Sequence, residues 1–229
     1  MADGGTIAQR ITDLIGSQYT TDASYEGDLI NAAINEIADM VSVDLLLKYS
    51  PAPTTVTSAT GVAIEDKKIL KVTRIQSNGG VERECLPLER TAFDAATDSG
   101  SIYKATTFSP VYKIHSDNAA STVVIHPSCT NGGQEGKIFY FPYVADSADS
   151  TGITQATVNT TLYLPSNIIH AIVLKSCVNI LKAYISNQVQ DEEDTEMMQM
   201  VSTQSQLLEK DFLNEIKRFT DESEKPGSE

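Results

Sequence analysis

Apolar residues recur at helical spacing near both ends of the 229-residue chain. Near the N-terminus, residues 6–17 and 24–49 each place apolar side chains every three or four positions, which predicts two helices. Thr6 is a candidate N-cap of the first helix, because its hydroxyl can accept a free backbone N–H. The stripe of the second helix consists of Ile30, Ile34, Ile37, Val41 and Leu45.

Two further helices are predicted near the C-terminus. Residues 166–188, with Ser166 as a natural N-cap, are apolar over more than half of the helix circumference. Such a helix is either central among its own neighbours or also covered by another subunit, and the sequence leaves both open. Residues 191–219 predict a long amphipathic helix after a break at Asn187 and Gln188. Its apolar side consists of Met198, Val201, Leu208, Phe212, Ile216 and Phe219.

Between these helical segments the apolar pattern changes to a period of two. Pro51 and Pro53 end the N-terminal helices because proline cannot continue a helix. Asn78-Gly79-Gly80 predicts a hairpin turn. The expected strands are 69–75, 81–88, 103–108, 111–115, 121–126 and 137–144, with a short helix at 88–96. Their regular spacing is typical of an antiparallel sheet, sandwich or barrel.

One helix pair alone buries little apolar surface, so the outer pairs are expected to pack on each other. The predicted fold is therefore α+β, with N- and C-terminal amphipathic helices packed as a helical bundle and an inserted antiparallel β-rich domain. The expected boundaries are 1–50 plus 162–220 for the helical domain, 51–161 for the insertion and 221–229 for a polar, disordered tail. Within the insertion, residues 145–161 are expected to form an irregular connection.

The chain is acidic, with a net charge of −14. It is a poor candidate for holding DNA or an anionic membrane, because both are bound mainly by Lys and Arg. The longest apolar runs are about seven residues, whereas a membrane span needs about 20. We therefore expect no membrane crossing, and the first residues show no signal-peptide pattern.

The sequence offers few residues for catalysis. It contains no phosphate-binding glycine loop, no nucleophile elbow and no His-Glu-x-x-His motif. His115 and His126 lie on adjacent predicted strands near Asp117, so a metal site or a base is conceivable, but ordinary strand histidines are favoured. His170 is expected to make a packing or inter-subunit contact. The cysteines, Cys85, Cys129 and Cys177, are expected to be reduced thiols in or near the core.

Two C-terminal features allow more than one interpretation. An acidic cluster either complements the positive end of the last helix or forms an acidic surface facing DNA or a basic partner. That cluster is Asp191, Glu192, Glu193 and Asp194. Met197, Met198 and Met200 form either part of the helix core or an adaptable docking surface.

Taken together, the chain resembles the head-to-tail adaptor (connector) proteins of tailed bacteriophages. The resemblance rests on the short helix at 6–11, the helical segment 25–37, and Leu164-Pro165-Ser166 opening a buried helix that an amphipathic one follows. A polar β-rich insert separates these parts. The acidic, tryptophan-free composition is also typical of a virion protein.

The resemblance implies a structural protein rather than an enzyme, without a cofactor. Such adaptors form a ring, usually of twelve copies, below the portal at the capsid vertex. The ring extends the DNA channel and docks the next neck or tail component. The implied partners are further copies of the chain, the portal protein and a downstream tail, nozzle or fibre protein, with DNA only as passing cargo and no membrane. The implied location is the virion neck, after synthesis in the bacterial cytoplasm.

Under this hypothesis, helical faces contact other copies or the portal, and the acidic cluster faces the channel. The interface candidates are Ile30, Ile34, Ile37, Met198, Val201, Leu208, Phe212, Ile216 and Phe219. The channel candidates are Asp191, Glu192, Glu193 and Asp194. The alternatives are another tail or neck protein, such as a tail terminator or fibre-attachment ring, and a small metal-dependent enzyme that uses His115 and His126.

Overall fold

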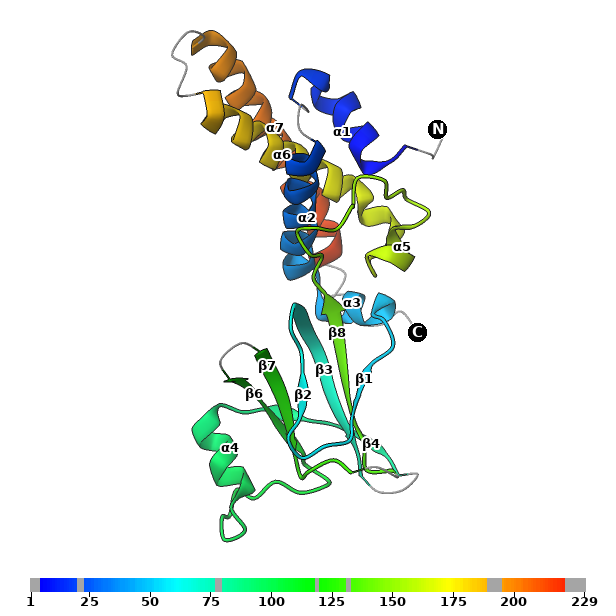
Figure 1. Cartoon of the computed structure of the whole chain (residues 1–229), viewed down its shortest axis with the longest axis vertical. Helices are drawn as coiled ribbons and strands as arrows, with labels where there is room; N and C mark the ends of the chain where they lie inside the picture. Colours follow the sequence, from blue (N-terminus) through cyan, green and yellow to red (C-terminus); the bar gives the residue numbers. More distant parts are fainter. Residues whose placement is uncertain are drawn as a thin grey trace. The chain divides into compact units, whose positions relative to one another are not determined.

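The computed structural model describes residues 5–19, 23–76, 80–117, 120–130, 133–188 and 195–220. The chain divides into two compact units, residues 1–49 with 143–229 (the helical unit) and residues 50–142 (the β unit). The expected α+β class is correct, with helices toward both chain ends and two sheets between them (Figure 1). The predicted turn at Asn78-Gly79, the acidic cluster at 191–194 and the tail at 221–229 lie outside the described residues.

The helices of the helical unit follow the apolar periodicity of the sequence. They are α1 (Ile7–Ile15), α2 (Ala23–Met40), α3 (Val43–Tyr49), α5 (Val158–Thr161), α6 (Ile169–Gln188) and α7 (Thr195–Thr220), with 3-10 turns η1 (Ser17–Tyr19) and η2 (Ser166–Ile168). Thr6 caps α1 as predicted, because its Oγ1 accepts the N–H of Gln9 at 3.2 Å.

Two helix boundaries differ from the prediction. The helix expected at 24–49 is interrupted after Met40, and a new helix begins at Val43. Ser42 marks this restart, because its Oγ accepts the N–H of Leu45 at 3.4 Å. Ser166 is not the N-cap of the next helix: it lies inside η2, and Pro165 takes the cap position.

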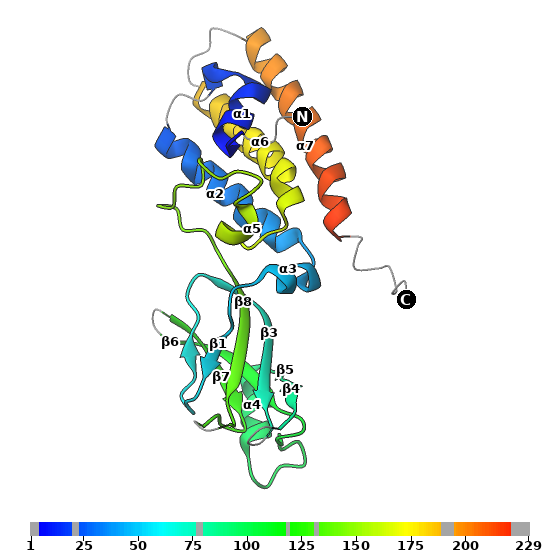
Figure 2. The same cartoon turned by 90° about the vertical axis from the view of Figure 1, so that its right-hand side faces the viewer.

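Helix α6 forms the core of the helical unit. It contacts α1, α2 and α7 (Figures 1 and 2). Its buried cation, Lys175, is 8% exposed, donates to Glu36 Oε1 of α2 at 2.6 Å and lies 5.4 Å from the ring centroid of Phe212 of α7. The apolar surface of α6 is therefore largely covered by the chain's own helices.

The stretch Ser166–Asn187, which is η2 with most of α6, is long and apolar enough to cross a membrane by length and composition alone. Of the apolar window within it, 67% is buried inside the structure. Such burial is typical of a core helix, so this stretch is weak evidence for a membrane span.

Residues 143–161 belong to the helical unit rather than to the β-rich insertion. The side-chain amide of Asn31 donates to three backbone carbonyls of this segment, and Asn35 exchanges two hydrogen bonds with the backbone of Val144. The three carbonyls are those of Ala145 (3.0 Å), Asp146 (3.2 Å) and Ala148 (2.9 Å). Helix α1 adds a bond from the N–H of Ile7 to the carbonyl of Ile153 at 2.9 Å. These long-range contacts place the unit boundary at 142/143, not at the expected 161/162.

The β unit contains two four-stranded sheets, in the orders β1-β8-β3-β4 and β2-β7-β6-β5. Its elements are β1 (Thr54–Val56), β2 (Val62–Ala63), β3 (Lys67–Ile75), β4 (Glu82–Glu84), β5 (Leu86–Pro87), α4 (Arg90–Thr97), β6 (Val111–Asp117), β7 (Ala120–His126) and β8 (Gly136–Pro142). All pairs are antiparallel except β5 with β6, which is parallel.

Two predicted strands of the β unit are wrong. The strand expected at 81–88 is divided, because β4 pairs with β3 in one sheet while β5 pairs with β6 in the other. The strand expected at 103–108 is a loop with a single isolated bridge between Thr106 and Ser109. In that loop, local side-chain hydrogen bonds replace the pairing with a neighbouring strand.

A buried guanidinium accompanies the apolar core of the β unit. Arg74 of β3 is 1% exposed. It donates to the carbonyls of Pro127 (2.8 Å), Ile75 (3.0 Å) and Ser128 (3.2 Å) and to Gln134 Oε1 (3.3 Å). The apolar core comprises Val56, Ile64, Val72, Cys85, Val123, Ile125, Cys129 and Ile138. Arg74 thus ties the segment after β7 to this core.

Candidate functional site

The apolar helix residues expected to contact other copies or the portal are mostly core residues. Eight of the nine are buried: Ile30, Ile34 and Ile37 at 0% exposure, and Val201, Leu208, Phe212, Ile216 and Phe219 at 8% or less. Only Met198 among the nine is partly exposed. The expectation is corrected for the eight, because the strongest apolar stripe of each helix is already covered by the chain itself.

Exposed apolar side chains concentrate instead on the loop that follows α4 (Figure 1), which we call the β-unit loop (residues 98–110). Ile102, Tyr103 and Phe108 are 90%, 74% and 67% exposed. Contiguous exposed apolar groups are uncommon on monomeric proteins and often mark interaction sites. The apolar pattern of the sequence predicts a strand here, so it gives no signal of an exposed loop.

The β-unit loop is held in shape by its own hydrogen bonds. Asp98 Oδ1 accepts the N–H of Gly100 at 2.9 Å, and Ser101 Oγ accepts the N–H of Tyr103 at 3.1 Å. Ala105 is buried, and its N–H donates to the carbonyl of Ala96 at 2.9 Å, which anchors the loop to α4. The apolar side chains therefore project from a locally ordered support.

A second exposed apolar surface lies along α7. Met200 and Leu207 are 74% and 60% exposed. They share a stripe with alternating steps of four and three residues, which keeps its members on one helix face. This α7 outer stripe consists of Met200, Gln204, Leu207, Asp211, Asn214 and Arg218.

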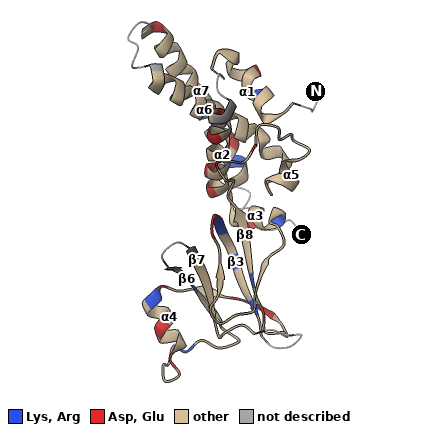
Figure 3. Cartoon of the chain, viewed as in Figure 1, with Lys and Arg blue, Asp and Glu red and all other residues tan. Residues whose placement is uncertain are grey.

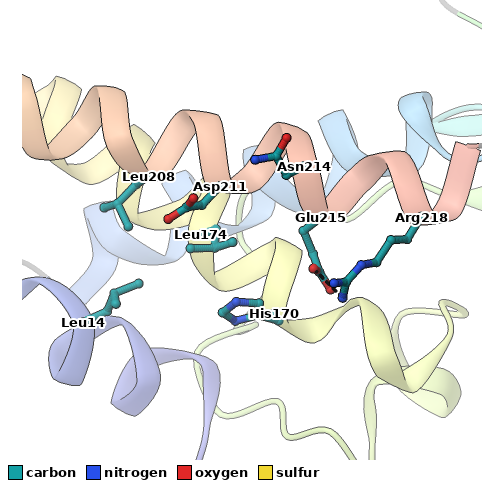
Figure 4. A pocket seen from close by; sticks show the side chains of 8 residues that line it. All are labelled: Leu14, His170, Leu174, Leu208, Asp211, Asn214, Glu215 and Arg218. Carbon is teal, nitrogen blue, oxygen red and sulfur yellow. Dashed lines mark ion pairs between the residues drawn. The ribbon is translucent and has the colours of Figure 1, made fainter.

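The C-terminal part of the α7 outer stripe, from Asp211 to Arg218, borders a pocket of about 360 Å³ (Figure 4). The lining residues are Leu14 of α1, His170 and Leu174 of α6, and Leu208, Asp211, Asn214, Glu215 and Arg218 of α7. Figure 4 shows the leucines toward one end and His170 facing the ion pair between Arg218 Nη1 and Glu215 Oε2 (2.9 Å) at the other. This α7 pocket combines apolar walls with the carboxylate of Asp211 and the Glu215–Arg218 ion pair, which suits an apolar side chain beside a cation that approaches Asp211.

The two histidines considered for a metal site do not converge. His115 pairs with Thr122, whereas His126 pairs with Val111, four residues away along β6. This register separates them by about 13 Å along the strands. Burial lowers the pKa of His126, and the charges of Lys104 and Arg74 lower it further. Within the described ranges, no group of three or more His, Cys, Asp or Glu side chains is placed to hold a metal ion.

The three cysteines are buried free thiols, as expected. Burial raises the pKa of Cys85 and of Cys177 to about 12. Burial also raises the pKa of Cys129, although Arg74 opposes this effect. A thiol with a raised pKa is rarely the reactive thiolate, so these cysteines have the character of core residues.

Figure 3 marks the charged residues in the part of the chain that the structure describes. Over the full sequence, charge is divided unevenly between the two units. The helical unit has 22 acidic and 8 basic residues, a net charge of −14, whereas the β unit has 9 of each and is neutral. The whole net charge of the protein therefore belongs to the unit with the α7 pocket, and none of it to the unit with the exposed loop.

No protein-family model matches the chain, and no curated protein matches it in sequence.

Proposed function

We propose that the protein is a structural component of a tailed-phage virion, a head-to-tail adaptor that forms a ring below the portal. In this role it extends the DNA channel and docks the next neck or tail component, and it is not an enzyme. Its partners are further copies of itself, about twelve in a ring, the portal protein and a downstream tail, nozzle or fibre protein. The observation that carries the proposal is the exposure of Ile102, Tyr103 and Phe108 on an ordered loop.

Apolar contacts of this kind suit an assembly of identical acidic chains. Copies that each carry a net charge of −14 repel one another at long range. Apolar burial, at about 25 cal/mol per Å² removed from water, supplies free energy that offsets this repulsion. The neutral β unit, with its exposed loop, provides such surface without adding to the repulsion.

The acidic helical unit suits a surface that DNA passes without binding. Affinity for DNA comes mainly from cationic side chains that displace counterions. With 22 acidic against 8 basic residues, the helical unit has few cations to offer. DNA is therefore cargo in this proposal rather than a ligand.

Electron microscopy of the full-length protein, alone and mixed with the portal protein encoded by the same genome, tests the proposal. We expect closed rings close to twelve copies, formed either by the protein alone or on the portal. A ring with sixfold symmetry would point instead to a tail terminator or another tail component. A protein that stays monomeric in both samples and never binds the portal contradicts the proposal.

A further inference from the structure

We propose that the β-unit loop of one copy docks into the α7 pocket of the neighbouring copy. This inference rests on the proposed ring, and it identifies the surfaces that would join its subunits. The donor side chains are Ile102, Tyr103, Lys104 and Phe108. The acceptor is the α7 pocket together with two exposed residues from the N-terminal part of the α7 outer stripe, Met200 and Leu207.

Apolar exposure favours this pairing. Of the large apolar side chains exposed in the described part of the chain, Ile102, Tyr103, Met200 and Phe108 have the four highest exposed fractions, between 67% and 90%. Leu207 and Leu14, at 60% and 41%, extend the acceptor around the pocket. An aromatic or aliphatic anchor that fills a pocket on its partner is the usual centre of a protein interface.

Charge complementarity favours a second copy as the occupant. The β-unit loop contains one acid, Asp98 at its start, and one base, Lys104, which is exposed. The α7 pocket presents two acids, Asp211 and Glu215, against one base, Arg218, which is ion-paired with Glu215. It belongs to the unit that has the entire net charge of the chain. A neutral loop with a lysine therefore meets an acidic rim without the repulsion that two acidic surfaces would have.

In the proposed ring the contact is heterologous, because the loop and the pocket of one copy bind two different neighbours. Each copy offers its loop to one neighbour and its pocket to the other. A heterologous contact repeats from copy to copy and closes into a ring when the rotation per subunit divides a full turn. The same loop-to-pocket contact could also be made twice about a twofold axis, so the proposed ring requires that it repeat in one direction from copy to copy.

Removal of the loop anchors is the first test. The triple variant I102S/Y103S/F108S should weaken association between copies by about a hundredfold or more, because three exposed apolar side chains lose their burial. The matched control is V43S/L213S, which changes two apolar residues that are 42% and 48% exposed and lie outside the proposed contact. The control should assemble as the wild type does. Association is measured by analytical ultracentrifugation of the full chain, with the portal protein added if rings need it.

A charge exchange tests whether loop and pocket touch. Lys104→Glu and Asp211→Lys should each weaken association about tenfold, and the double variant should recover most of the loss, because it restores the opposite charges. A cross-link gives an independent readout: a Tyr103→Cys chain mixed with a Leu207→Cys chain should form a heterodimer with a bis-maleimide. The native cysteines are buried and serve as the background control.

The outcomes separate this inference from the proposed function. Rings that form normally from the triple loop variant, with no heterodimer in the mixture of Tyr103→Cys and Leu207→Cys chains, overturn the docking inference and leave the ring intact. Loss of portal binding alone, with copy-to-copy association unchanged, shows that the loop contacts the portal and also overturns it. Failure of the wild-type chain to form rings contradicts the proposed function, and absence of the cross-link at high protein concentration then overturns the docking inference as well.

Discussion

The helical unit and the β unit each stabilise a buried cation, but with different partner groups. In the helical unit, Lys175 is paired with the carboxylate of Glu36 at 2.6 Å. In the β unit, Arg74 donates to three backbone carbonyls and one side-chain amide instead. A carboxylate thus neutralises the buried cation of the helical unit, whereas mainly backbone carbonyls bind that of the β unit. The net charges of the two units are −14 and zero.

The surfaces differ in the same direction. The helical unit combines a large negative charge with a pocket whose rim has carboxylates, whereas the neutral β unit exposes three large apolar side chains on one loop. The exposed apolar loop and the acidic pocket therefore belong to different units. If the units are also independent in stability, each should depend on its own core.

The largest effect is expected for Phe212→Ala in the helical unit. Phe212 is 1% exposed and packs beside Lys175. Its truncation should lower the free energy of unfolding by about 3–5 kcal/mol through lost burial and a residual cavity. Urea denaturation combined with thiol labelling checks this: Cys177 of α6 should label at lower urea, while Cys85 and Cys129 of the β unit stay protected. Equal loss of protection at all three thiols would show that the units do not unfold separately.

Arg74→Met is the corresponding change in the β unit. It removes the donors of four acceptors, and we expect a loss of about 3 kcal/mol. The same labelling experiment should now expose Cys85 and Cys129 before Cys177. The matched control is Lys71→Met on the same strand, where the ion pair with Glu84 is at the surface and should contribute less than about 1 kcal/mol. Similar losses from both variants would contradict the role assigned to Arg74.

Asn31→Ala tests the attachment of residues 143–161 to the helical unit. It leaves three carbonyls without their amide donor, and the expected cost is about 2 kcal/mol. Hydrogen exchange should become faster in residues 144–153. The exposed Asn214 provides the control, since Asn214→Ala should change stability by less than about 0.5 kcal/mol. Unchanged exchange in the Asn31 variant would contradict the boundary at 142/143.

The smallest effect concerns pH and the β unit. Burial lowers the pKa of His126 below its ordinary value of 6.5, so the unfolded chain binds this proton more readily than the folded one. The contribution of neutral His126 to stability is complete above pH 6.5 and decreases as the pH falls below it. Thermal unfolding of wild type and His126→Gln between about pH 7 and pH 5 measures this. The wild type should lose more stability than the variant, and a loss of equal size in both would contradict the prediction.

Local periodicity is enough to predict much of the fold. The step of three or four residues predicts α1, α6 and α7, and the step of two predicts β3, β6, β7 and β8. The errors occur where local hydrogen bonds compete with the pattern. Ser42 restarts a helix within one continuous apolar stripe, and Ser101 caps a turn inside a stretch with strand-like residues.

The candidate site can be predicted far less well, because periodicity does not say what covers an apolar face. Phe212 and Ile37 qualify as interface candidates by their place on a stripe, yet their own chain buries them. The α7 pocket brings together residues far apart in the sequence, such as Leu14 and Leu208. The β-unit loop is shaped by local hydrogen bonds that its strand-like residue pattern does not reveal. The attachment of residues 143–161 depends likewise on Asn31, 114 positions before Ala145.

The mass of the assembly is the most direct test of the central claim that the β-unit loop joins copies of this chain into a ring. Native mass spectrometry of the full-length protein, with and without the portal protein, should show one closed oligomer near twelve copies for the wild type and only smaller species for I102S/Y103S/F108S. The claim is contradicted if the wild-type chain remains a monomer under both conditions, or if the triple variant forms the same ring.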